Sequence, residues 1–262
     1  MHWYAGTSGY AYKEWIGSFY PDGMKADAML SYYAVHLPAV EINNTFYRMP
    51  RTQVLEAWAD AVPKDFRFVI KASRRITHEQ KLVDADESTD YLARKLEVLE
   101  GKLGAVLFQL PPYLKKDIER LRAFLKIVPE SMPAAIEFRH ASWFDDETFD
   151  LLSSHNRALC INEGDTLPQP SRFATTDWVY LRMRQPEYSD AALVGNCRSA
   201  QATGAQHGFA FFKHEDEAGG PALAARFLSL AREQRRPPQP PRRAESRYSA
   251  LRNRRGSDQH TA

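Results

Sequence analysis

The feature that most constrains the fold is a regular alternation of two kinds of segment. Short stretches rich in β-branched and aromatic residues are separated by longer stretches with helical periodicity, a pattern typical of parallel βα units. Eight strands are expected, at residues 3–7, 39–43, 66–72, 105–110, 134–139, 158–162, 178–183 and 208–213. Helices are expected at residues 24–37, 52–62, 88–100, 117–128, 145–155, 190–203 and 219–234.

Eight strands favour a closed (β/α)₈ TIM-type barrel over an open, doubly wound sheet. The first strand runs into Gly6-Thr-Ser-Gly-Tyr10 and lacks the GxGxxG fingerprint of a dinucleotide-binding sheet. The length of 262 residues also fits one barrel domain. We expect an irregular sixth βα unit, because residues 163–177 contain Pro168 and Pro170 and no helical period.

The charge distribution divides the chain into a barrel domain at residues 1–233 and a tail at residues 234–262. From Arg232 onward there are nine arginines against three acidic residues, whereas residues 1–231 carry 26 basic and 30 acidic side chains. The Arg- and Pro-rich composition predicts that the tail is disordered. Such a tail can bind nucleic acid through phosphate contacts, or it can be a solvated segment with no dedicated partner.

Composition also limits the compartment and the cofactors. No apolar run approaches the roughly 20 residues that span a bilayer, and no signal segment is evident, so we expect a cytoplasmic protein with no membrane contact. Cys160 and Cys197 are not in CxxC spacing, which is consistent with a reducing compartment. No nucleotide-cofactor motif is present. A metal is not expected either, because the histidines form no HxH or HExxH pattern, although His78, His140 and His214 follow strand ends.

Polar residues occupy the inward-facing positions of the predicted strands. Alternate residues of a barrel strand point inward, and in several strands the other positions are apolar and suit the helix side. For the eighth strand the inward face is ambiguous. The inward polar residues gather at the C-terminal strand ends, where barrel active sites lie. This set comprises Glu41, Asn43, Lys71, Gln109, Glu137, Arg139, Asn162, Arg182 and Lys213. Tyr180 and Arg184 share the inward face of the seventh strand.

Four cations facing two carboxylates favour a small anionic ligand, phosphorylated or sugar-like. We expect Glu41 and Glu137 to act as an acid/base pair and Lys71, whose pKa neighbouring cations would lower, to act as a nucleophile. Asn43, Gln109, Arg139, Asn162, Arg182 and Lys213 would bind the substrate. Hydrolase, lyase and isomerase reactions all remain open. One alternative is a non-catalytic nucleotide or nucleic-acid binding protein, and another is a buried ion-pair network that only closes the barrel end.

Aromatic residues crowd the first loop, which contains Tyr10, Tyr12, Trp15 and Tyr20. They either pack that loop or form a stacking wall that Trp143 would complete. The run Gly6-Thr-Ser-Gly-Tyr10, with Trp15 and Phe19-Tyr-Pro21, resembles the start of the YecE-like family, domain of unknown function 72. Further similar blocks are Val40-Glu-Ile-Asn-Asn-Thr-Phe-Tyr47, Phe68-Val-Ile-Lys-Ala72 with Thr77-His78, Gln109-Leu-Pro-Pro112, Glu137-Phe-Arg-His140 with Trp143, Tyr180-Leu-Arg182 and Phe211-Phe-Lys-His214.

This resemblance covers the chain to about residue 230 and implies a TIM-type barrel with no established activity. It adds Thr45, Tyr47, His78 and Trp143 to the positions already selected. Of these we expect Tyr47, His78 and Trp143 to bind substrate. The chain departs from the family pattern after the seventh strand, where many members have His-Gly and this sequence reads Met183-Arg-Gln185.

Overall fold

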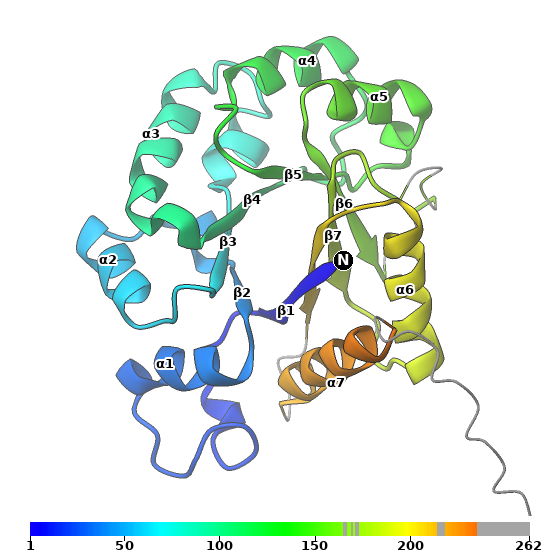
Figure 1. Cartoon of the computed structure of the whole chain (residues 1–262). Helices are drawn as coiled ribbons and strands as arrows, with labels where there is room; N and C mark the ends of the chain where they lie inside the picture. The colour runs from blue at the N-terminus through cyan, green and yellow to red at the C-terminus, as the bar shows by residue number, and fades with distance from the viewer. Residues whose placement is uncertain (165–166, 169, 171–172, 214–217, 235–262) are drawn as a thin grey trace, which may run out of the picture.

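The computed structural model describes residues 1–164, 167–168, 170, 173–213 and 218–234, and it contains a closed barrel of parallel strands (Figure 1). Each strand pairs with its neighbours in chain order, and β8 pairs with β1 to close the ring. The strands are β1 (His2–Ser8), β2 (Ala39–Ile42), β3 (Arg67–Lys71), β4 (Leu103–Gln109), β5 (Ala134–Glu137), β6 (Ala158–Glu163), β7 (Trp178–Met183) and β8 (His207–Phe212).

Helices surround the barrel on its outside (Figure 1). They are α1 (Ala26–His36), α2 (Thr52–Asp60), α3 (Asp86–Leu96), α4 (Ile118–Ile127), α5 (Asp146–Ser154), α6 (Asp190–Ala202) and α7 (Gly219–Glu233). Shorter turns of helix are η1 (Lys13–Trp15), η2 (Asn44–Phe46), η3 (Arg75–Glu79), η4 (Glu97–Lys102) and η5 (Ala141–Trp143). The TIM-type barrel predicted from the alternation is confirmed, and each predicted strand lies within two residues of the observed one.

The predicted start of the third helix was wrong by two residues. The helix begins at Asp86, so Ser88 lies in its first turn instead of preceding it. The start near Asp145 is confirmed, because the Asp145 carboxylate accepts a hydrogen bond from the Thr148 amide at 3.0 Å and so caps α5. No described helix is long and apolar enough to cross a membrane.

The sixth βα unit is irregular, as its prolines predicted. In the described part of residues 164–177 the chain forms no helix before it enters β7. Thr175 fastens this connection to β6, because its hydroxyl accepts a hydrogen bond from the Leu159 amide and donates one to the Arg157 carbonyl. The described part of this connection therefore packs on the barrel without a covering helix.

Successive residues of each strand point to opposite sides of the barrel wall, so the strands separate two apolar cores. Side chains such as Val40, Ile70 and Val179 face outward into the core between the strands and the helices. A smaller core fills the barrel, and it includes Val69, Leu107, Tyr180, Phe209 and Phe211. Phe209 and Phe211 also resolve the ambiguous inward face of the eighth strand. Because the lower barrel is filled with apolar side chains, polar inward residues are left at the C-terminal end, where a (β/α)₈ barrel carries its ligand site.

Candidate functional site

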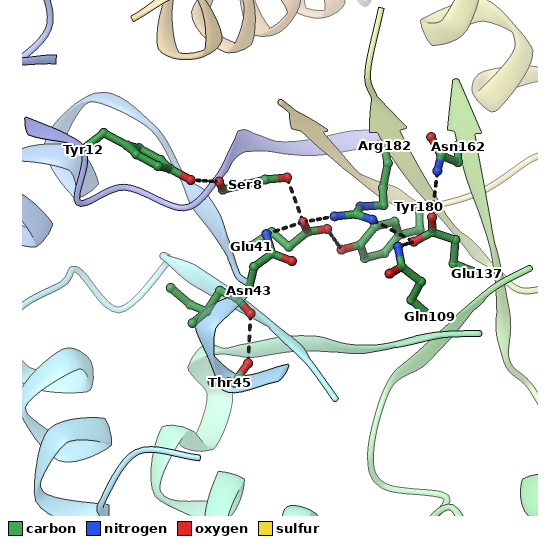
Figure 2. Close-up of polar contacts among 11 residues, drawn as sticks. Ser8, Tyr12, Glu41, Asn43, Thr45, Gln109, Glu137, Asn162, Tyr180 and Arg182 are labelled. Carbon is green, nitrogen blue, oxygen red and sulfur yellow. Dashed lines mark hydrogen bonds and ion pairs between the residues drawn. The ribbon is translucent and has the colours of Figure 1, made fainter. Parts of the chain in front are cut away.

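Two carboxylates from different sides of the barrel share one guanidinium at the C-terminal mouth (Figure 2). Arg182 on β7 donates from Nη2 to Glu41 Oε1 of β2 at 2.6 Å, and from Nη1 to Glu137 Oε2 of β5 at 2.8 Å. The carboxylates are 0% exposed and the guanidinium side chain is 1% exposed. Buried charges are tolerated when they are paired and hydrogen-bonded in this way. The alternation of inward and outward strand positions predicted that these three residues lie together at the mouth, and the structure places them there.

Further donors bind the carboxylate oxygens of this network. Glu41 Oε1 accepts hydrogen bonds from Ser8 Oγ at 2.7 Å and from Asn43 Nδ2 at 3.0 Å. Its other oxygen accepts one from the Tyr180 hydroxyl at 2.6 Å. Gly9 helps to hold Ser8 in place, because its amide donates to the Glu41 carbonyl at 2.8 Å and its φ of 97° suits glycine.

Glu137 is bound in the same manner by amide side chains of the neighbouring strands. Gln109 Nε2 donates to Glu137 Oε2 at 2.9 Å, and Asn162 Nδ2 donates to Oε1 at 2.7 Å. Figure 2 shows these side chains converging from β4, β5 and β6. Every oxygen of both carboxylates therefore accepts a hydrogen bond from the protein.

The network stays ionised across the neutral pH range. Burial alone would raise the pKa of Glu41, but the Arg182 charge and the hydrogen bonds from Arg182, Tyr180 and Ser8 outweigh it and lower the pKa to about 2. Burial also opposes ionisation of Glu137, yet Arg182 and Arg184 lower its pKa below the usual range. Burial opposes the charge on Arg182 in turn, and the adjacent Glu137 and Glu41 raise its pKa.

Lys71, at the end of β3, is the ammonium group next to this network. Its Nζ lies 4.2 Å from the centre of the Phe46 ring and makes no hydrogen bond or ion pair with the described residues. Burial and the Arg182 charge lower the pKa of Lys71 to about 8. The Thr45 hydroxyl fixes the backbone here by donating to the Lys71 carbonyl at 2.7 Å.

Two buried polar atoms at the C-terminal end of the barrel have no hydrogen-bond partner among the described residues: Asn43 Oδ1 and Arg184 Nε. Ile42 pairs with Ile70 in the β2–β3 register, so Asn43 follows β2 at the level of Lys71. Arg184 continues the inward face of β7 that Tyr180 and Arg182 begin. The Asn43 acceptor, the Arg184 guanidinium donor and the Lys71 amine thus all follow or end strands at the mouth, and groups of these kinds suit a ligand that carries both an anionic group and a hydroxyl.

The remaining predicted site residues differ in their access to this point. His78 is partly exposed, contacts the Thr77 hydroxyl at 2.9 Å, and packs edge-on against Phe46. Burial and the nearby Lys71 lower its pKa. Tyr47 is 74% exposed at the rim. Arg139 is partly exposed and Lys213 is exposed, each just past the end of its strand.

Trp143 lies in the packing beneath the mouth. Its side chain is fully buried, stacks on Phe138 at a centroid distance of 4.8 Å, and donates a hydrogen bond to the Leu114 carbonyl. Trp15 and Tyr20 of the first loop are buried as well, so the structure uses them to pack that loop. Trp143 can therefore affect a ligand only by holding the loops after β4 and β5 in place.

The predicted site set omitted four residues that the structure adds. Ser8 and Tyr180 bind Glu41 directly, Arg184 contributes to the charge around Lys71, and Phe46 covers Lys71. Strand parity already pointed Tyr180 and Arg184 inward, so that signal was present in the sequence. Phe46 follows β2 in a helical turn, where alternation no longer indicates a direction.

The described residues contain no cluster of three or more His, Cys, Asp or Glu side chains arranged to hold a metal ion. Three histidines follow predicted strand ends. Of these, His78 and His140 are described, and His214 lies outside the described residues.

The sequence of this chain matches the family described as "Protein of unknown function DUF72" over residues 4–246. The chain belongs to the DUF72 family. The DUF72 match begins at Tyr4 within β1, extends through β2 to β8, and includes every residue of the network at the mouth.

DUF72 relatives agree with this assignment at moderate identity. UPF0759 protein YunF of Bacillus subtilis (strain 168) is 30% identical over 150 residues, which make up 54% of this chain and 53% of that protein. UPF0759 protein YecE of Escherichia coli (strain K12) is 29% identical over 116 residues, 44% of this chain and 43% of that protein. The aligned stretches thus span about half the length of these relatives.

Solved DUF72 structures have the same fold. The crystal structure of a DUF72 family protein from Thermotoga maritima MSB8 superposes with a TM-score of 0.76 and 25% identity, covering 89% of this chain and 100% of that chain. A DUF72 family protein from Enterococcus faecalis V583 superposes with a TM-score of 0.69 at 22% identity, covering 88% of this chain and 98% of that chain, which supports the fold alone.

Proposed function

We propose that this protein is an enzyme that binds a small anionic substrate, phosphorylated or sugar-like, at the C-terminal mouth of the barrel and uses the Lys71 amine as its reacting group. The observation that carries the proposal is the position of Lys71. It lies against the Phe46 ring, beside a buried charge network, and lacks a carboxylate partner among the described residues.

The electrostatics support an amine that reacts near neutral pH. A lysine whose pKa is about 8 is partly unprotonated in that range, and an unprotonated amine is a base and a nucleophile. Arg184 and Arg139 add positive charge at the strand ends, and guanidinium groups bind phosphate or carboxylate in a bidentate manner. A cationic mouth therefore attracts the anion and also raises the unprotonated fraction of the amine.

In this proposal Glu41 and Glu137 position the site and do not transfer protons. Both are fully buried, and every oxygen of each carboxylate already accepts a hydrogen bond from the protein, so little of either group is available to a substrate. Their lowered pKa values also make them weak bases at neutral pH. Their negative charges instead hold Arg182 in place, and Arg182 contributes to the low pKa of Lys71.

A thermal-shift panel of sugar phosphates, hydroxy acids and nucleoside monophosphates tests substrate binding. Any ligand of the native state raises Tm according to its concentration and affinity. At least one anion should raise Tm, and the shift should be lost in Arg184→Ala and retained in Arg122→Ala, an arginine on α4 that is paired with Glu119 and whose side chain is 40% exposed. A panel with no stabilising anion, or a shift that survives Arg184→Ala unchanged, would overturn the proposal.

A further inference from the structure

A cavity lies between the segments that follow β2 and β3 and the first turns of α3. Its volume is about 440 Å³, within the range of roughly 300–1,000 Å³ that is typical of small-molecule sites. It shares no lining residue with the network of Glu41, Glu137 and Arg182. The lining residues are Arg48, Met49, Ser73, Arg75, Glu87, Ser88, Tyr91, Leu92 and Arg94.

The charge of this cavity is net positive, and two of its arginines have no carboxylate partner among the described residues. Three guanidinium groups line it against the single carboxylate of Glu87. Arg94 is paired with Asp90 at 2.8 Å, but the side chains of Arg48 and Arg75 are exposed and make no hydrogen bond or ion pair with any described residue. Arginine side chains without protein partners are the ordinary means of binding phosphate groups.

The opposite wall offers an aromatic surface and a hydroxyl group. Tyr91 is 47% exposed, and the buried side chain of Leu92 lies next to it in the lining. Ser88 Oγ is buried and has no hydrogen-bond partner within the described part of the chain. An aromatic face combined with unpaired donors suits a ligand that has a flat ring at one end and an anion at the other.

We propose that this cavity is a binding site for a phosphate monoester that carries a flat ring. The ring lies on Tyr91, and Arg48 and Arg75 hold the phosphate. The Ser88 hydroxyl supplies a further hydrogen bond. This site goes beyond the reaction proposed at the mouth and does not depend on it, because no residue of the mouth lines the cavity.

Phenyl phosphate is the probe for this site, with inorganic phosphate and phenol as its two halves. Binding is followed in the full chain by the ¹⁵N–¹H resonances of the arginine Nε groups. Phenyl phosphate should shift the resonances of Arg48 and Arg75 and should bind more tightly than either half. Arg48→Ala and Arg75→Ala should each weaken it about tenfold, as expected for loss of a charged hydrogen bond, while Arg122→Ala leaves it unchanged. These arginines are exposed, so the variants should fold normally.

A second variant separates ring recognition from anion recognition. Tyr91→Leu should weaken phenyl phosphate binding and leave inorganic phosphate binding unchanged, because it removes only the aromatic surface. Absence of shifts at Arg48 and Arg75, or equal affinities in Arg75→Ala and Arg122→Ala, would overturn the proposal. Binding of single-stranded RNA that weakens with salt and depends on Arg75, without phenyl phosphate binding, would also overturn it in favour of a nucleic-acid contact.

Discussion

Arg182 Nη2 lies 2.6 Å from Glu41 Oε1, so a single guanidinium on β7 joins a carboxylate on β2 across the width of β8 and β1. The same guanidinium binds Glu137 on β5. Three strands that are not neighbours are therefore linked at one buried point. The shape of the mouth depends on this link, and so does the electrostatic environment of Lys71.

Replacing Arg182 with methionine should strongly destabilise the protein. The variant leaves two buried carboxylates without their counter-ion, which costs about 3–5 kcal/mol of unfolding free energy. Urea unfolding of wild type and Arg182→Met measures the difference. The triple variant Glu41→Gln, Glu137→Gln, Arg182→Met should recover much of the loss, because it removes the unpaired charges. An unfolding free energy of Arg182→Met within about 1 kcal/mol of the wild-type value would contradict the role given to Arg182.

Tyr180→Phe should destabilise the protein by about 1.5–3 kcal/mol, the usual contribution of a hydrogen bond to a charged group. The lost bond is the 2.6 Å contact from the Tyr180 hydroxyl to Glu41 Oε2 inside the barrel. Tyr4→Phe is the matched control, because Tyr4 packs on the same inner core and its hydroxyl makes no hydrogen bond with described residues. Equal unfolding free energies for the two variants would show that this bond contributes little.

Lys71→Met should stabilise the protein at neutral pH by about 1–2 kcal/mol, after a discount for solvent screening of a partly exposed amine. The folded pKa of Lys71, about 8, lies below the unfolded value, about 10.5. The folded state therefore binds fewer protons between these values, and wild-type stability rises with pH there. The advantage of Lys71→Met should shrink over the same range. A difference in unfolding free energy between Lys71→Met and wild type that does not change with pH would contradict the lowered pKa of Lys71.

Removal of residues 235–262 should leave anion binding at the mouth unchanged. The residues that carry the proposed site all precede this tail, which lies outside the described residues. Any affinity for nucleic acid that the tail provides should fall with its removal and should decrease linearly with salt on logarithmic axes. Loss of the thermal shift from a small anion in the truncated protein would place part of the site in the tail.

Alternation of apolar and polar residues predicted the barrel well, because a two-residue period assigns each strand residue to one of two cores. The same period placed Glu41, Glu137 and Arg182 at one end. It could not reveal that one guanidinium bridges both carboxylates, since that contact joins strands far apart in sequence. It also could not place Phe46 over Lys71, or show that Trp143 is buried against Phe138 in the core outside the strands, because loop geometry depends on tertiary contacts.

The most direct test of the proposed chemistry is the rate at which acetyl phosphate, a small anionic acylating reagent, modifies each lysine, measured by peptide mass spectrometry. Lys71 should react at least about tenfold faster than the exposed Lys13 and Lys25 near neutral pH, because its amine is more often unprotonated and lies in a cationic mouth. Its rate should rise with pH and level off above about 8. Arg184→Ala should slow it. Modification of Lys71 no faster than that of Lys13 would contradict its assignment as the reacting group.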